Sequence, residues 1–138
     1  MRSGLFYLDF TVRDYECDMQ GIVNNAVYQN YLEHARHEYL KGAGFEFSEL
    51  ILRGINLVVV RAELDYKRSL RSGDRFQVQV RLERASKLRF AFLQEIFRLP
   101  ERKLILKAKV VGTVLNADGK PQLLDEMVSL LDDSVLGL

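Results

Sequence analysis

The chain of 138 residues is poor in several residue types on which whole classes of proteins depend. It has one cysteine, Cys17, two histidines, two prolines and no tryptophan. A single cysteine excludes an intrachain disulfide and a cysteine-based metal cluster. The longest aliphatic runs are only a few residues, as in Leu57 to Val60, so we expect no membrane span. The first residues contain no apolar stretch long enough for a secretory signal, which favours a cytoplasmic location.

Several catalytic and nucleotide-binding signatures are also absent. There is no Gly-x-Ser-x-Gly elbow, which argues against an α/β-hydrolase, and neither a P-loop nor a Gly-x-Gly-x-x-Gly fingerprint. The sequence contains no repeat, linker or low-complexity tract. With 48% hydrophobic and 28% charged residues, we expect residues 1–138 to form a single globular domain.

The net charge of +1 hides an uneven distribution of charge along the sequence. Residues 61–109 hold fourteen Lys and Arg against six Asp and Glu, whereas the remaining residues hold six against thirteen. A basic segment of this kind could face phosphates, nucleic acid or an acidic protein. The solvated faces of strands explain the same charges, since Lys and Arg commonly protect exposed strands. No RNA-binding signature accompanies the segment, so we expect no nucleic-acid partner.

The spacing of apolar residues predicts an α+β domain. A helical spacing predicts a long helix over residues 24–42, for which Asn24 and Asn25 are candidate caps. A short second helix is expected from Phe47 to Arg53, and a C-terminal helical turn from Leu124 to Leu131. Alternating apolar and polar residues predict strands at 6–13, 55–69, 76–83, 87–98 and 103–115. Their short connections imply antiparallel neighbours, and hence a curved antiparallel sheet of five or six strands wrapped around one long helix.

The most informative segment of the sequence runs from Arg13 to Arg36. It places the carboxylate of Asp18 a few residues before the predicted helix, whose first backbone N–H groups have no partner within the helix. A carboxylate can attack a thioester carbonyl or take a proton from water, and the N–H groups can stabilise the oxyanion that forms. Gly21 allows a turn between the two parts. The pairing suits acyl transfer, although an Asp before a helix is also a common loop or capping residue.

The same segment resembles the active-site signature of the hot-dog-fold thioesterases of the 4-hydroxybenzoyl-CoA thioesterase type. The residues that carry the resemblance are Asp18, Gly21, Val23 to Ala26, Tyr28, Tyr31 to Glu33, Ala35 and Arg36, continued by Gly54, Tyr66 and Ser72 to Asp74. Within that superfamily the chain is most similar to the plant acyl-lipid and methylketone-synthase-type thioesterases and their bacterial relatives, through residues 12–16, 21–28, 36–38, 70–76 and 97–100. Glu16 stands where Asp is often found, and Ile22 where many members have His.

The resemblance implies a hot-dog fold and an enzyme that hydrolyses acyl-CoA or acyl-acyl carrier protein (acyl-ACP) thioesters to a carboxylic acid and a thiol. Asp18 would act as general base or nucleophile, and the backbone N–H of Asn25 would polarise the thioester carbonyl. No metal or cofactor is expected. The carboxylate of Asp18 can activate the attack, and the N–H of Asn25 can polarise the carbonyl, which are the two functions that a Lewis-acid metal would supply. The acyl tail is expected against Ile51, Leu52 and Leu57 to Val60, Val59 among them, although each could equally be an ordinary core residue. At the hairpin where similar enzymes meet the head group, the expected contacts are Ser86, Lys87 and Arg89. Similar domains form homodimers or homotetramers with the active site at the subunit boundary.

Several alternatives remain open at this point. A non-catalytic protein that binds acyl thioesters or lipids could use the same pocket, although it would have no use for a desolvated Asp18. Glu33 keeps a possible direct role, since some distant hot-dog thioesterases use a helix glutamate as catalyst. Cys17 is interpreted as a small packing residue. His34 and His37 have a spacing that could hold a metal, but no third ligand is visible nearby.

Overall fold

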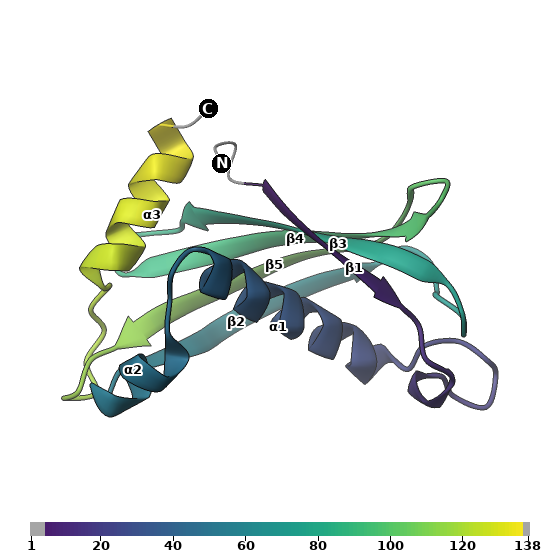
Figure 1. Ribbon diagram of the computed structural model, residues 1–138, viewed down its shortest axis with the longest axis horizontal. Coiled ribbons are helices and arrows are strands. Elements are labelled where there is room, and N and C mark those ends of the chain that lie inside the picture. Colours follow the sequence, from purple (N-terminus) through teal and green to yellow (C-terminus); the bar gives the residue numbers. More distant parts are fainter. Residues whose placement is uncertain (1–4, 137–138) are drawn as a thin grey trace.

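In the computed structural model, which describes residues 5–136, a five-stranded antiparallel sheet curves around a long helix (Figure 1). The elements in chain order are β1 (Leu5–Thr11), the 3-10 turn η1 (Asp14–Glu16), α1 (Asn25–Gly42), α2 (Phe47–Leu52), β2 (Asn56–Tyr66), β3 (Arg75–Arg84), β4 (Arg89–Leu99), β5 (Lys103–Leu115) and α3 (Asp125–Leu136). The strand order in the sheet is β1-β3-β4-β5-β2. The α+β architecture expected from the sequence is confirmed.

The boundaries of most elements lie within a few residues of those expected. Helix α1 begins at Asn25, and the side chain of Asn24 accepts a hydrogen bond from the N–H of Ala26 at 3.0 Å, which makes Asn24 the N-cap. The C-terminal helix is the exception, because α3 is 12 residues long and exceeds the short turn that was expected. Met127 and Leu131, one helical turn apart, are both fully buried and attach this helix to the core.

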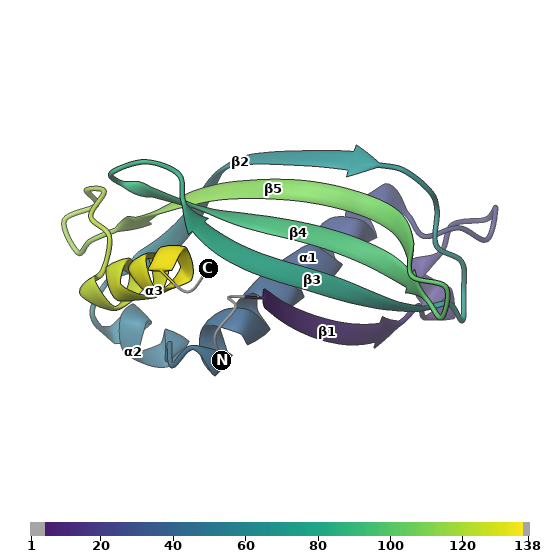
Figure 2. The same cartoon turned by 90° about the horizontal axis from the view of Figure 1, so that it is seen from above.

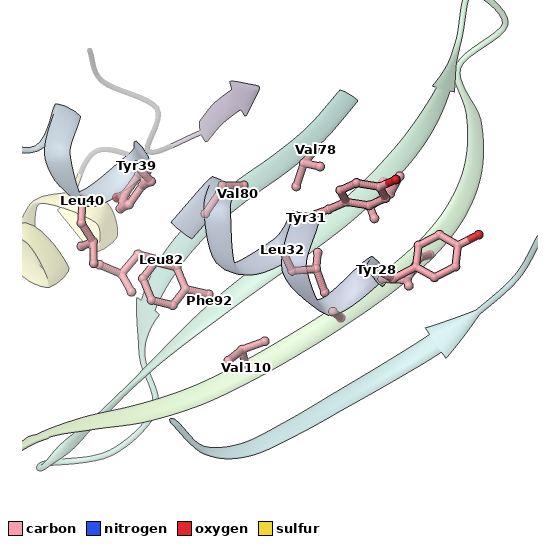
Figure 3. Close-up of a cluster of buried hydrophobic side chains, with 14 of the residues drawn as sticks. Tyr28, Tyr31, Leu32, Tyr39, Leu40, Val78, Val80, Leu82, Phe92 and Val110 are labelled. Atoms are coloured by element: carbon pink, nitrogen blue, oxygen red, sulfur yellow. The ribbon is translucent and has the colours of Figure 1, made fainter. Parts of the chain in front are cut away.

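The core lies between the concave face of the sheet and α1. Alternate residues of β3 are fully buried, as the period of a half-buried strand requires: Phe76, Val78, Val80 and Leu82. They face the buried side of α1, which consists of Tyr28, Tyr31, Leu32, Ala35, Tyr39 and Leu40. Figure 3 shows side chains of α1 gathered with those of β3, β4 and β5 in one cluster. Within residues 5–136, no helix is both long and apolar enough to cross a lipid bilayer.

The sheet has two ends that carry different connections (Figure 2). At the first, which we call the η1 end, the register brings together the end of β1, the start of β3, the end of β4 and the start of β5. The segment from η1 to the start of α1 also lies there. At the opposite end, which we call the hairpin end, lie the β3–β4 hairpin, α2, α3 and the start of β2. Strands of ten residues or so place the two ends about 33 Å apart.

Candidate active site

Asp18 lies in a tight turn that leads from η1 towards α1. Its carbonyl accepts a hydrogen bond from the N–H of Gly21 at 3.0 Å, and its own N–H donates to the carbonyl of Ile22 at 2.9 Å. Gly21 has a φ of 82°, a conformation that residues with a side chain rarely adopt. Cys17 and Val23 form an antiparallel bridge on either side of the turn. The turn expected at Gly21 is confirmed, and it holds Asp18 in a defined position.

The carboxylate of Asp18 is exposed, and the backbone holds one of its two oxygens. Oδ1 accepts hydrogen bonds from the N–H of Gln20 at 2.9 Å and from the N–H of Ile22 at 3.4 Å. In the part of the chain that the structure describes, Oδ2 has no hydrogen-bond partner. One oxygen therefore orients the group, while the other can reach a water molecule or a substrate.

The first turn of α1 presents an unpaired N–H group beside this loop. The N-cap side chain of Asn24 takes the N–H of Ala26, and the Asn24 carbonyl takes that of Val27 at 2.9 Å. The N–H of Asn25 has no acceptor among residues 5–136. The loop folds back against this helix end, because the N–H of Asn24 donates to the carbonyl of Glu16 at 3.1 Å. A donor at the positive end of a helix is suited to stabilise a developing oxyanion.

Tyr31 of α1 ties η1 to the core, a role that the sequence analysis missed. Its hydroxyl donates to Oε1 of Glu16 at 2.8 Å, and the N–H of Arg13 donates to the same oxygen at 2.8 Å. Burial, together with the hydrogen bond to Glu16, raises the pKa of Tyr31 well above its ordinary range, so the hydroxyl stays a donor. The available signal was a tyrosine on the buried face of a helix, because a buried hydroxyl needs a partner.

Tyr28 holds the other side of the loop through the segment before β3. Its hydroxyl accepts a hydrogen bond from the N–H of Leu70 at 2.9 Å, and the Leu70 carbonyl accepts one from the N–H of Val23 at 2.9 Å. Burial raises the pKa of Tyr28. Ile22 and Arg71 form a further antiparallel bridge between the two segments. The Asp18 loop is thus attached on both sides to elements that belong to the core.

The remaining candidates from the sequence occupy structural positions. Cys17 is half-buried against the core, and burial followed by neighbouring carboxylates raises its pKa, which keeps it a thiol and supports its interpretation as a packing residue. His34 packs edge-on against Phe10 with ring centroids 5.8 Å apart. His37 places Nε2 3.9 Å from a carboxylate oxygen of Glu33. Among the described residues, no three possible metal ligands of the His, Cys, Asp or Glu type come together.

A pocket of about 230 Å³ opens at the hairpin end between α1, α2 and the start of β2. Its apolar wall includes Phe90, Phe92, Val110, Leu50, Ile51 and Leu57 to Val59. Val59 is 54% exposed and therefore lies at the rim. Glu33, Arg36 and His37 of α1 supply its polar wall. A mainly apolar cavity with a few polar groups is typical of a small-molecule site.

Arg36 is a half-buried cation in the wall of this pocket. Its Nη1 donates to Oε1 of Gln94 at 3.1 Å, and Nε2 of Gln94 donates to the carbonyl of Leu32 at 3.0 Å. Gln94 is only 1% exposed, so these hydrogen bonds fix its side chain inside the core and orient Arg36 at the pocket wall. Burial lowers the pKa of Arg36, and the charge of Glu33 opposes this shift. The pair was not predicted from the sequence; the signal for it was a glutamine at an inward, otherwise apolar position of β4.

The predicted site residues divide between the two ends of the sheet. Asp18 and Asn25 lie at the η1 end (Figure 2). The predicted substrate contacts lie at the hairpin end: Val59 near the start of β2, and Ser86, Lys87 and Arg89 at the β3–β4 turn. Ser86 and Arg89 close this turn, with the N–H of Ser86 donating to the Arg89 carbonyl at 3.1 Å. Within one chain, therefore, the structure does not bring the two sets together.

Comparison with known proteins gives matches along most of the chain. The sequence profile of a family described as "Thioesterase-like superfamily" matches residues 12–131. The chloroplastic acyl-acyl carrier protein thioesterase ATL2 of Arabidopsis thaliana is 41% identical over 118 residues, which is 86% of this chain and 62% of that protein. The chain likewise covers 60% of the length of the related ATL3. It thus spans about three fifths of these two plant relatives.

Solved structures share the fold. A hypothetical protein from Aquifex aeolicus, AQ1494, is 32% identical with a TM-score of 0.83, and the match covers 91% of this chain and 98% of that one. Slr0204, a 1,4-dihydroxy-2-naphthoyl-CoA thioesterase from Synechocystis, matches with a TM-score of 0.87 at 21% identity over 94% of this chain and 97% of that one. The hot-dog fold implied by the sequence resemblance is confirmed.

Proposed function

The chain belongs to the thioesterase-like superfamily, and from this premise we propose that it hydrolyses acyl thioesters of CoA or of acyl carrier protein. The observation that carries the proposal is the position of Asp18, whose turn is folded against the helix start where the N–H of Asn25 is unpaired. The names of the relatives, which include an acyl-ACP thioesterase, agree with this reaction class.

In the proposed reaction, water adds its oxygen to the acyl carbon, the carbon–sulfur bond breaks, and the thiol leaves with a proton. Oδ2 of Asp18 either takes a proton from the attacking water or attacks the carbonyl itself to form an anhydride that water then opens. The N–H of Asn25 donates to the carbonyl oxygen as negative charge develops there. Because the N–H groups of Gln20 and Ile22 already hold Oδ1, the carboxylate needs little reorientation.

The distribution of the site over both ends of the sheet supports a complete site made by two copies. Strand β2 is an edge strand, and its Val59 and Val60 are 54% and 43% exposed. Exposed apolar edges favour pairing with another strand. Antiparallel pairing of β2 with the same strand of a second copy would place the hairpin end of one copy beside the η1 end of the other. Asp18 would then face the pocket, Lys87 and Arg89 of its partner.

The charges of β2 are compatible with such a two-fold axis. Arg61 and Glu63 are exposed and already pair within the chain, with Nε of Arg61 2.7 Å from the carboxylate. An axis at Ala62 would set Arg61 opposite Glu63 of the second copy, and opposite charges across strands are favourable. In Arg61→Glu, the new carboxylate would face that of Glu63 of the second copy, and symmetry repeats this repulsion on the other side of the axis. We therefore expect a weaker dimer in sedimentation and a lower turnover in kinetic assays. The exchange Arg61→Glu/Glu63→Arg should restore both; a fully active monomer would exclude the shared site.

The function is tested by a hydrolysis screen on the purified chain. Acyl-CoA and acyl-ACP substrates of increasing chain length, with thiol release as the readout, should give turnover that the Asp18→Asn variant lacks. If the wild-type rate equals that of the variant on every substrate, the chain is not a thioesterase of this kind. Binding of the same substrates without turnover would instead support a non-catalytic acyl-thioester or lipid binder.

The cytoplasmic location and the single domain over residues 1–138 stay predictions, and ATL2 is named as chloroplastic.

A further inference from the structure

Two turns at the η1 end of the sheet carry an excess of positive charge. Residues 67–75 and 98–103 contain seven Lys and Arg against two acidic residues, Asp74 and Glu101. The two turns are neighbours in space. Arg75 pairs with Leu99 across β3 and β4, and the N–H of Lys67 donates to the carbonyl of Ile105 at 2.8 Å. The excess of charge is therefore concentrated along one end of the sheet.

Four of these cations make no direct contact with another group among residues 5–136. Arg98 pairs with Glu101 at 2.8 Å, and Arg102 lies over the ring of Phe97 with its Cζ 4.1 Å from the ring centroid. In contrast, the exposed side chains of four residues make no hydrogen bond, ion pair or ring contact with any part of the chain that the structure describes: Lys67, Arg71, Arg75 and Lys103. We call these four the basic row. Cations whose side chains are not held by such contacts are available to a binding partner.

The basic row adjoins the loop that carries Asp18. Arg71 forms an antiparallel bridge with Ile22, four residues after Asp18. Residues in such a bridge have Cα atoms about 4.5–5.5 Å apart. From Arg71 the row continues through Arg75 at the start of β3 to Lys103 at the start of β5 and Lys67 just after β2. A molecule bound along the row would lie next to the carboxylate.

We propose that the basic row docks an acidic carrier protein while the thioester arm of that protein reaches Asp18. The proposal rests on the proposed thioesterase function. From β3 to the segment after β2 the row crosses three strand spacings, about 14 Å. This width exceeds that of a single phosphate group and suits the acidic face of a folded protein. Steering by complementary charge would also speed the encounter of the two proteins.

The middle of the convex face of the sheet offers a matched set of cations. There Lys107 lies opposite Asp65 and Lys109 opposite Glu63 across β5 and β2, so acidic neighbours compensate the positive charges. Arg81 of β3 is exposed on the same face. The triple variant Arg81→Ala/Lys107→Ala/Lys109→Ala removes the same charge as a triple substitution in the basic row. It should leave the kinetics with every substrate unchanged.

The test compares one acyl group on three carriers: acyl carrier protein, CoA and N-acetylcysteamine. In Arg71→Ala/Arg75→Ala/Lys103→Ala, kcat/KM for acyl-ACP should fall through KM. Each exposed ion pair contributes roughly a factor of two, so three give about tenfold, or about 1.4 kcal/mol. The N-acetylcysteamine thioester should not respond. Added salt should reduce the wild-type advantage, because exposed charges are screened beyond about 8 Å at physiological ionic strength.

Each other outcome has a defined meaning. Unchanged kinetics on acyl-ACP would overturn the docking proposal. An equal loss of kcat/KM on acyl-ACP and acyl-CoA would also overturn it, because it would show that the row binds phosphate groups. An equal loss on all three substrates would overturn it by assigning the row to fold or catalysis. If the wild-type chain hydrolyses none of the substrates, the proposed function fails, and binding of fluorescently labelled holo acyl carrier protein then tests docking alone. Binding about tenfold weaker in the row variant than in the wild type and the convex-face control supports the proposal; equal binding overturns it.

Discussion

Replacing Asp18 by asparagine separates the proposed chemistry of the carboxylate from its part in folding the loop. The amide oxygen of asparagine can still accept the hydrogen bonds from the N–H groups of Gln20 and Ile22, which are now 2.9 Å and 3.4 Å long. The variant has neither the charge nor the basicity to activate water or to attack a carbonyl. We expect kcat to fall about 10²- to 10⁴-fold, the contribution of a positioned general base. The free energy of unfolding should change by less than about 0.5 kcal/mol.

The alanine variant of the same residue calibrates this result. Asp18→Ala removes the acceptor for both N–H groups, one of them at good hydrogen-bond distance and one at the limit. Because the loop is exposed, water replaces part of what is lost. We expect a loss of about 1 kcal/mol in the free energy of unfolding, the net value of one such bond. Turnover should fall at least as far as in the asparagine variant, since the side chain that orders the turn is lost together with the carboxylate.

Urea unfolding followed by circular dichroism measures the stability of both variants, and thiol release from acyl-CoA and acyl-ACP measures turnover. Cys17→Ala serves as the control, because the thiol stays protonated at neutral pH and most activity should remain. Turnover of the asparagine variant close to that of the wild type would refute the assignment of Asp18. A loss in Cys17→Ala as large as in Asp18→Asn would show that the chemistry had been assigned to the wrong side chain.

Three further predictions concern the surroundings of the site. Lys87→Ala/Arg89→Ala should raise KM for acyl-CoA with little change in kcat, since a phosphate grip stabilises ground and transition states alike; an effect of equal size on an N-acetylcysteamine thioester would rule this out. Tyr31→Phe removes the hydroxyl that donates to the carboxylate of Glu16 in η1. We expect the free energy of unfolding in urea to fall by about 1–2 kcal/mol, and kcat to fall at unchanged KM. Wild-type stability and wild-type kcat in this variant would show that the hydrogen bond is dispensable. Gly112→Ala would place a Cβ 2.7 Å from a ring atom of Phe90 in the pocket wall. The free energy of unfolding should fall by about 1–3 kcal/mol, and the preferred acyl chain should become shorter. An unaltered chain-length profile would mean that the Phe90 ring moves without narrowing the pocket.

The parts of the structure that were predictable from the sequence are those with a strong local pattern. The alternation in β3 and the helical spacing in α1 mark a buried face with period two or 3.6, and both elements formed where expected. The turn at Gly21 and the cap at Asn24 were also predictable, because their hydrogen bonds close within a few residues. Helix α3 was underestimated, since its attachment through Met127 and Leu131 depends on a sheet formed by residues far away in the sequence.

The ties that surround the site could not be read from the sequence, because their partners are distant along the chain. The hydroxyl of Tyr31 and the carboxylate of Glu16 are fifteen residues apart, and Arg36 and Gln94 are fifty-eight apart. Neither pair has a local signature, and each meets only after α1 has packed on the sheet. The distance between the β3–β4 hairpin and Asp18 follows in the same way from the direction of the strands, which residue types do not reveal.

The attachment of the Asp18 loop to the segment before β3 has a consequence for the chain during synthesis. The N–H of Val12 donates to the carbonyl of Asp74 at 2.8 Å, and the N–H of Val23 donates to the carbonyl of Leu70. These hydrogen bonds can form only after acceptors some fifty to sixty residues further along the chain have been synthesised. Contacts between such distant residues form only after the entropy of closing the intervening segment has been overcome. A nascent chain that has released Asp18 but not Asp74 from the ribosome therefore carries the carboxylate of Asp18 without the elements that hold its loop, and the loop forms together with the pairing of β1 and β3.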